Sequence, residues 1–156
     1  SLLKLKKKKK NIKLHMIGKL QTNKVKFAVR LFDFIHSVDS EKLAKKIAEE
    51  QAKIKRNVKI FIQVNIGNEI QKSGIDQSAI QNLILFCKDL GLDVIGLMCI
   101  PPANSDPTDY FKKMNEINNS LDLNELSMGM SSDYLEAARN NSTYLRIGSS
   151  IFGRRS

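Results

Sequence analysis

Residues 59–66 read KIFIQVNI, a stretch in which side chains of two kinds alternate along the chain. A period of two predicts a β-strand, because successive side chains of a strand point to opposite faces of a sheet. One face is made only of Ile and Val and suits packing against helices. The other face carries Phe61, Gln63 and Asn65 and becomes polar toward the end of the stretch. Polar groups at the carboxyl end of a helix-covered strand are typical of a parallel α/β barrel.

Strand-like and helix-like segments alternate on both sides of this stretch. The expected strands are residues 14–17, 34–38, 59–66, 94–100, 125–130 and 143–147, and the expected helices are residues 23–32 and 133–139 and three helices that begin near residues 40, 76 and 106. Six strands separated by five helices predict a parallel sheet covered by helices. An open doubly wound sheet also fits this pattern. The polar end of residues 59–66, and the lack of GxGxxG and GxxxxGK[ST] signatures, favour the barrel.

Composition restricts the class of protein. A chain of 156 residues with 42% hydrophobic and 27% charged residues is expected to form one globular domain. It has no apolar run of the roughly 18 residues that a membrane span needs. No apolar segment follows the basic start, so we expect a cytoplasmic protein without a membrane partner. Cys87 and Cys99 lie in apolar surroundings without CxxC spacing, which predicts reduced core thiols and neither a disulfide nor a metal site.

The formal net charge of +10 comes mostly from the start of the chain. Residues 1–13 contain seven lysines and no acidic residue, and the remainder has 19 basic and 16 acidic residues. We therefore divide the chain into a basic N-terminal helix or tail, residues 1–13, and a domain, residues 14–156. The run could bind phosphate backbones without specificity. No aromatic residues interleave with it as a base-stacking platform requires, so nucleic acid is not an expected partner.

Small residues follow the last two predicted strands. Gly129, Ser131 and Ser132 come after one strand, and Gly148 and Ser149 come after the next. Loops after neighbouring parallel strands lie on the same rim, and glycine and serine there supply backbone and hydroxyl donors to an anion. The pattern predicts a phosphate site.

Arg146 immediately precedes one of these loops and points inward in the predicted strand. A buried arginine needs a partner. The alternative to a ligand is a carboxylate of the barrel core, and the sequence leaves both choices open.

Several segments together resemble the pyridoxal 5′-phosphate homeostasis protein family, which is similar to the N-terminal barrel of alanine racemase. They are HMIGKLQTNK, IHSVDS, QVNIGNEIQKSGI, GLMCIPP, LSMGMSSDYLEA and STYLRIGSSIFG, in this order. The resemblance implies a fold-type III TIM barrel that holds pyridoxal phosphate at its carboxyl rim. By the same resemblance, Arg146 faces the pyridine nitrogen, and Ser131, Gly148 and Ser149 hold the phosphate. Ser149 stands where the family usually has threonine.

The resemblance extends to three more residues. Met128 and Asn65 are expected cofactor contacts, and Lys72 of the KSGI segment is a possible second lysine for the cofactor. The family's Schiff-base lysine lies at the end of a first barrel strand that has no counterpart here. We therefore expect about six of eight βα units, an N-terminally truncated sequence, and no catalytic residue.

Three functions follow from these expectations. The first is a non-catalytic carrier or buffer of pyridoxal phosphate, a monomer or weak dimer with cofactor-dependent apo-enzymes as possible recipients. An arginine at the pyridine nitrogen supports this function, because it keeps the nitrogen unprotonated and the ring a poor electron sink. The second is a fold-type III enzyme such as an amino-acid racemase, with a fragment without function as a further possibility. The third is a nucleic-acid binder that uses the basic tail.

Overall fold

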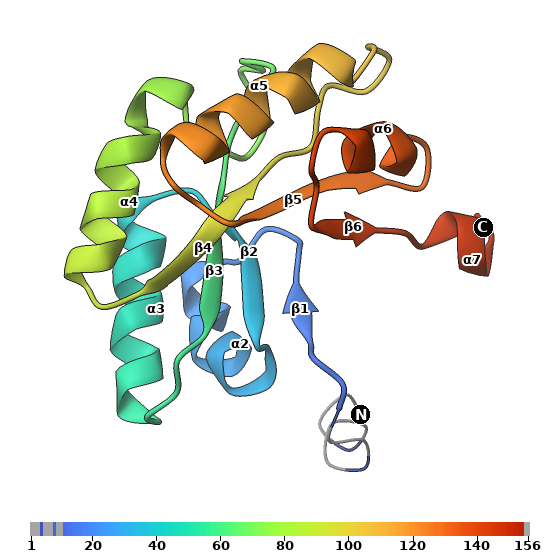
Figure 1. The fold of residues 1–156 in the computed structure, drawn as a ribbon. Helices are drawn as coiled ribbons and strands as arrows, with labels where there is room; N and C mark the ends of the chain where they lie inside the picture. Colours follow the sequence, from blue (N-terminus) through green and yellow to red (C-terminus); the bar gives the residue numbers. More distant parts are fainter. Residues whose placement is uncertain (1–3, 5–7, 9–10, 155–156) are drawn as a thin grey trace.

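The computed structural model describes residues 4, 8 and 11–154. In this part of the chain six strands form one sheet: β1 (His15–Met16), β2 (Phe34–Val38), β3 (Lys59–Gln63), β4 (Asp93–Met98), β5 (Glu125–Met130) and β6 (Tyr144–Arg146). They lie in the order β1-β2-β3-β4-β5-β6, and each adjacent pair is parallel. Because the order never reverses, every right-handed crossover places its helix on the same face. The sheet curves into a half-barrel with its helices outside (Figure 1), which confirms the barrel over the doubly wound sheet.

Helices connect the strands on the outer face. They are α2 (Val25–Leu31), α3 (Glu41–Lys53), α4 (Ile80–Asp89), α5 (Thr108–Ser120) and α6 (Tyr134–Arg139), with 3₁₀ turns at Thr22–Lys24 and Gln77–Ala79. A side chain caps α3, and another binds the backbone at the start of α5. The Ser40 Oγ accepts a hydrogen bond from the Leu43 N–H at 3.1 Å, and Asp106 accepts one from the Thr108 N–H at 3.0 Å. None of the helices described combines the length and apolarity that a membrane crossing requires.

Two cores lie on the two faces of the sheet. The larger one packs the outward side chains of the strands, such as Ile35, Ile60 and Leu97, against the helices. The smaller one fills the barrel interior with Phe34 and Phe61 and with other apolar side chains. Alternation along each strand assigns its residues to these two cores. Cys87 and Cys99 are buried free thiols of the larger core, and burial raises the pKa of each to about 12.

The structure corrects several predicted boundaries. The strand expected over residues 59–66 ends at Gln63, because the following loop returns to it. Ile75 donates to the Gln63 carbonyl at 2.8 Å and accepts from the Asn65 N–H at 2.9 Å, so the backbone groups of these residues bind the loop. The strands expected over 94–100 and 143–147 end at Met98 and Arg146.

A short helix, α7 (Ser149–Phe152), replaces part of the turn expected near the end of the chain. The helix expected from residue 106 begins at Thr108. The predicted basic tail, residues 1–13, falls largely outside the described residues.

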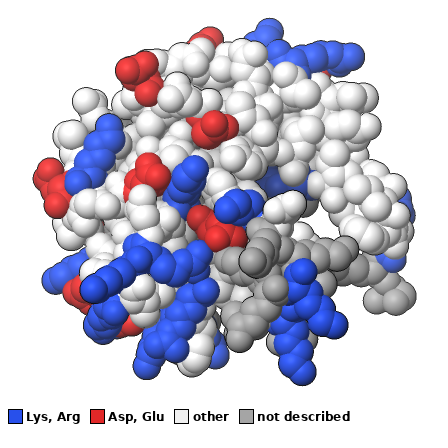
Figure 2. All heavy atoms as spheres, turned by 60° about the horizontal axis from the view of Figure 1, so that its bottom comes forward, with Lys and Arg blue, Asp and Glu red and all other residues white. Residues whose placement is uncertain are grey.

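Arg56 fastens the end of the barrel from which the strands start. Its Nη1 donates to the carbonyls of Val29 and Arg30 at 2.7 and 2.8 Å, and its Nη2 donates to Asp33 at 3.0 Å. The other Asp33 oxygen accepts from the Leu14 N–H at 2.9 Å, which ties β1 to this cluster. Figure 2, which brings the bottom of Figure 1 forward, shows basic side chains gathered along its lower edge, with acidic ones among them.

Candidate anion and ring site at the ends of β5 and β6

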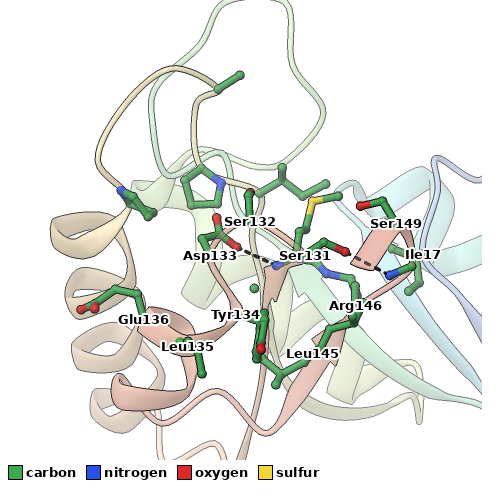
Figure 3. Close-up of a pocket in the computed structure, with 18 of the residues that line it drawn as sticks. Ile17, Ser131, Ser132, Asp133, Tyr134, Leu135, Glu136, Leu145, Arg146 and Ser149 are labelled. Carbon is green, nitrogen blue, oxygen red and sulfur yellow. Dashed lines mark hydrogen bonds between the residues drawn. The ribbon is translucent and has the colours of Figure 1, made fainter. Parts of the chain in front are cut away.

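A pocket opens at the carboxyl ends of β5 and β6, the rim where the sequence predicts a phosphate site. The residues that line it include Ser131, Asp133, Arg146, Gly148 and Ser149 (Figure 3). Met130 at the end of β5 is paired with Arg146 at the end of β6, so the two loops leave the sheet side by side. The prediction that these loops meet at one rim is confirmed.

Arg146 is a cationic residue that lines the pocket at the end of β6. Its Nη2 donates to the Cys99 carbonyl at 2.8 Å, whereas its Nε and Nη1 are buried without a hydrogen-bond partner in the described structure. Burial lowers the pKa of Arg146. The carboxylate partner considered from the sequence is not found, since no ion pair joins Arg146 to an acidic residue of the described chain. A buried donor without an acceptor is costly, so the site is suited to a ligand that brings one.

Ser131 forms the second half of the site. Its Oγ accepts hydrogen bonds from the backbone N–H groups of Gly148 and Ser150 at 3.2 and 3.3 Å. The serine oxygen thus lies where an anionic oxygen could accept from the same two donors. The turn before it depends on Gly129, whose φ of +102° suits glycine and where an added Cβ would lie 2.6 Å from the Ala137 Cβ.

A chain of hydrogen bonds inside the half-barrel links three further polar side chains, Ser127, His36 and His15. The Ser127 Oγ bonds to His36 Nδ1 at 2.8 Å, and His36 Nε2 bonds to His15 Nδ1 at 2.9 Å. His36 stacks on Phe61 with ring centroids 4.2 Å apart. Burial, and then the charges of His15 and Arg146, lower the pKa of His36 to about 3. The His36 imidazole is therefore neutral at physiological pH.

Sequence reasoning missed these interior polar residues. In residues 34–38, FIHSV, the alternation places His36 on the same face as Phe34. A histidine on an inward face is the signal that could have found it. Its partner Ser127 is 91 residues away, and that pairing depends on the fold.

The remaining predicted cofactor contacts lie outside this pocket. The Met128 side chain is fully buried in the larger core, facing the helices. Asn65 closes its own loop, because its amide accepts from the Glu69 N–H at 3.1 Å and donates to the Glu69 carbonyl at 2.7 Å. Lys72 forms an ion pair with Glu69 at 3.0 Å in the same loop. The structure therefore brings together Arg146, Ser131, Gly148 and Ser149 and places the other three elsewhere.

Comparisons with known proteins show what this chain is similar to. The family model described as alanine racemase, N-terminal domain, matches residues 2–156. A pyridoxal phosphate homeostasis protein of Aquifex aeolicus is 37% identical over 155 residues, which cover 93% of this chain and 68% of the relative. A homologue of that name from Pasteurella multocida is 34% identical over 159 residues, or 94% of this chain and 68% of its own length. The chain thus spans about two thirds of the length of these curated relatives.

Solved structures give the same result. PipY of Synechococcus elongatus with PLP bound superposes with a TM-score of 0.87 at 30% identity, over 96% of this chain and 74% of PipY. An alanine racemase of Clostridium difficile superposes with a TM-score of 0.72 at 14% identity, over 99% of this chain and 43% of the racemase. The second likeness concerns the fold alone.

Proposed function

We propose a function from one premise: this chain belongs to the alanine racemase N-terminal domain family, whose model matches residues 2–156. The chain binds pyridoxal 5′-phosphate at the ends of β5 and β6 and acts as a carrier or buffer of the cofactor in the cytoplasm. Its curated relatives are named pyridoxal phosphate homeostasis proteins, and PipY has PLP bound.

One observation supports the proposal most directly. Arg146 keeps Nε and Nη1 buried without an acceptor among the described residues, beside a turn in which Ser131, Gly148 and Ser150 gather donors around one point. Pyridoxal phosphate carries a ring nitrogen that accepts a hydrogen bond and a phosphate that accepts several. Both ends of the cofactor are therefore complementary to groups that this chain presents.

Each residue has a distinct task in this proposal. Arg146 donates to the ring nitrogen, and because the guanidinium is itself a cation, it disfavours a proton on that nitrogen. The backbone N–H groups of Gly148 and Ser150 bind the phosphate, together with the Ser131 hydroxyl. The cofactor supplies an electron-withdrawing ring when bound, and an arginine at its nitrogen weakens that property. The arrangement favours holding the cofactor over general carbanion chemistry, so cofactor-dependent apo-enzymes are the proposed recipients.

Equilibrium dialysis of the whole chain against pyridoxal phosphate tests the proposal. Ser131→Ala removes the hydroxyl that the proposal assigns to the phosphate alongside the two N–H groups, and we expect its dissociation constant to rise roughly tenfold, as for loss of a hydrogen bond to a charged group. Ser132→Ala is the matched control, because Ser132 is an exposed neighbour in the same turn and makes no hydrogen bond to a described residue. Pyridoxal, which lacks the phosphate, should bind both variants equally.

Two results would contradict the proposal. The first is an unmodified chain that does not retain pyridoxal phosphate. The second is equal binding of pyridoxal phosphate to the Ser131→Ala and Ser132→Ala variants, which would place the phosphate elsewhere.

A further inference from the structure

Asp133 lies on the rim of the pocket, two residues after Ser131 (Figure 3). Its Oδ1 accepts a hydrogen bond from the Met130 N–H at 2.7 Å, and its own N–H donates to the Met130 carbonyl at 3.1 Å. These two bonds close the turn that leads from β5 into α6. Ser131 lies inside this turn, so the position of its hydroxyl depends on the turn that Asp133 closes.

The same turn is joined to the loop after β6. The Ser131 Oγ accepts from Gly148 and Ser150, and the Ser150 hydroxyl donates to the Ser131 carbonyl at 3.5 Å. Asp133 therefore acts on the anion donors through Ser131 and is a positioning residue. Without the bond to Met130, the turn would lose the restraint that holds Ser131 opposite Gly148.

The charge of Asp133 has a second effect. Its carboxylate forms no ion pair with a described residue, and its Oδ2 accepts no hydrogen bond from one. It nevertheless lies close enough to act electrostatically on Arg146 and Cys99. An unpaired negative charge on the rim of a site that gathers anion donors repels an anionic ligand.

We propose that Asp133 has two opposed effects on this site: it braces the turn that places Ser131, and its charge lowers the affinity for phosphate. A carrier must release what it binds, and a fixed negative charge beside the phosphate favours release. The proposal rests on the proposed function for the identity of the ligand, a phosphate ester of an aromatic aldehyde. The chemistry it invokes applies equally to inorganic phosphate.

Two substitutions separate the effects. In Asp133→Asn the side-chain oxygen can still accept from the Met130 N–H, but the charge is gone. In Asp133→Ala both the acceptor and the charge are gone. Inorganic phosphate is titrated into the whole chain and followed through the backbone amide signals of Gly148 and Ser150. Folding of each variant is checked by the amide signals of β2 and β3, which lie away from the turn.

We expect Asp133→Asn to bind phosphate roughly three- to tenfold more tightly than the unmodified chain at low ionic strength, the size expected for one partly screened charge nearby. The advantage should shrink as salt is added, since salt screens the repulsion. Asp133→Ala should bind more weakly than Asp133→Asn, because its turn is no longer braced.

Several results would overturn the inference. Equal phosphate affinity of the unmodified chain and Asp133→Asn at low salt would exclude the repulsion. Equal phosphate affinity of Asp133→Ala and Asp133→Asn would exclude the bracing of the turn. Amide signals that do not respond to phosphate in any variant would also overturn it. A parallel titration with pyridoxal phosphate tests the ligand separately. If phosphate behaves as expected and pyridoxal phosphate does not bind, the proposed function fails and the role of Asp133 stands.

Discussion

Arg146 and Arg56 differ in how many hydrogen bonds they donate within the described structure. Arg56 donates three hydrogen bonds, two to backbone carbonyls and one to Asp33. Within the part of the chain that the structure describes, Arg146 donates one, to the Cys99 carbonyl, and keeps two buried nitrogens without a partner. The hydrogen bonds of Arg56 hold parts of the fold together, whereas Arg146 has buried donors at the pocket that no described acceptor satisfies. This contrast supports a structural role for Arg56 and the proposed binding role for Arg146.

Replacing each arginine with methionine should therefore change stability in opposite directions. We expect Arg146→Met to raise the free energy of unfolding of the ligand-free chain by about 1–2 kcal/mol, because it removes buried donors that lack acceptors. Arg56→Met should lower it by about 1–3 kcal/mol, because it breaks bonds that hold the segment before β3 to α2 and to Asp33. Urea unfolding followed by circular dichroism measures both. If Arg146→Met destabilised the chain as much as Arg56→Met, Arg146 would be a structural residue.

Buried His36 and partly buried His15 predict how the free energy of unfolding depends on pH. The pKa of His36 is about 3 in the folded chain and 6.5 in its ordinary state, and burial also lowers the pKa of His15. The unfolded chain therefore takes up protons first as pH falls, so stability is greatest above pH 6.5 and declines below it. The decline is up to about 1.4 kcal/mol per pH unit for each fully linked group.

This decline can be assigned to the histidines. The pKa of Glu50 is lowered to about 2 by hydrogen bonds from Lys53 and Lys46, so the stability it contributes is lost only below its ordinary value of 4.5. Urea unfolding between pH 7.5 and 4.5 should show a shallower slope for His36→Gln, which can still hydrogen-bond but does not titrate. A slope unchanged by that substitution would exclude His36 as its source.

At the scale of elements, Gly96 governs how closely β4 approaches β5. A Cβ added at Gly96 would overlap the backbone carbonyl of Glu125, and Gly96 and Glu125 are paired in the sheet. Backbone cannot move aside as the end of a flexible side chain can. Gly96 is therefore required by the spacing of the two strands.

Gly96→Ala should consequently lower the free energy of unfolding by roughly 2–4 kcal/mol, through overpacking against backbone. Gly18→Ala is the matched control, because no atom of a described residue lies within 4 Å of a Cβ at Gly18. The control should change stability by less than about 0.5 kcal/mol. Thermal unfolding of the two variants compares them, and equal midpoints would show that β4 and β5 can separate without cost.

Local pattern was enough to predict most elements. Alternation identified β3, and helical spacing of apolar residues identified α3 and α4, because each pattern reflects burial on one face. The end of β3 could not be predicted, since it depends on Ile75, which reaches Gln63 only when the intervening loop folds back. Helix α7 was missed because a four-residue helix after glycine has no periodicity to detect.

The site was predictable to the same degree. Ser131, Gly148 and Ser149 were found because small residues after neighbouring parallel strands must share a rim. The partner of Arg146 was not, because Cys99 is 47 residues away and offers a backbone carbonyl, which every residue has. The hydrogen bond from the Met130 N–H to Asp133 is local. It could not be predicted, because an aspartate just before a helix is equally typical of an ordinary helix cap.

At the scale of the whole molecule, the protection of backbone amides against hydrogen exchange should vary along the sheet. Strand β3 is buried and paired on both sides, by β2 and β4. Strand β6 is paired by β5 in the described structure, and α7 exposes Ile151 and Phe152 by 66% and 87%. Amide hydrogen exchange should be slowest in β3 and fastest in β6 and α7. Equal protection of β3 and β6 would show that the half-barrel opens only as one cooperative unit.

The position of the anion donors in the chain has a consequence for regulation. Ser131, Gly148 and Ser150 all belong to two consecutive βα units, β5-α6 and β6-α7, and Arg146 lies in the second of them. In the proposed site, detachment of β6 from β5 would separate the two loops and abolish binding of the anion, while β1 to β4 kept their pairing. The affinity for the anion is thus thermodynamically linked to the local opening of the segment from β5 to α7. Loading with an anion would in turn protect that segment, and not the rest of the sheet, against proteolysis.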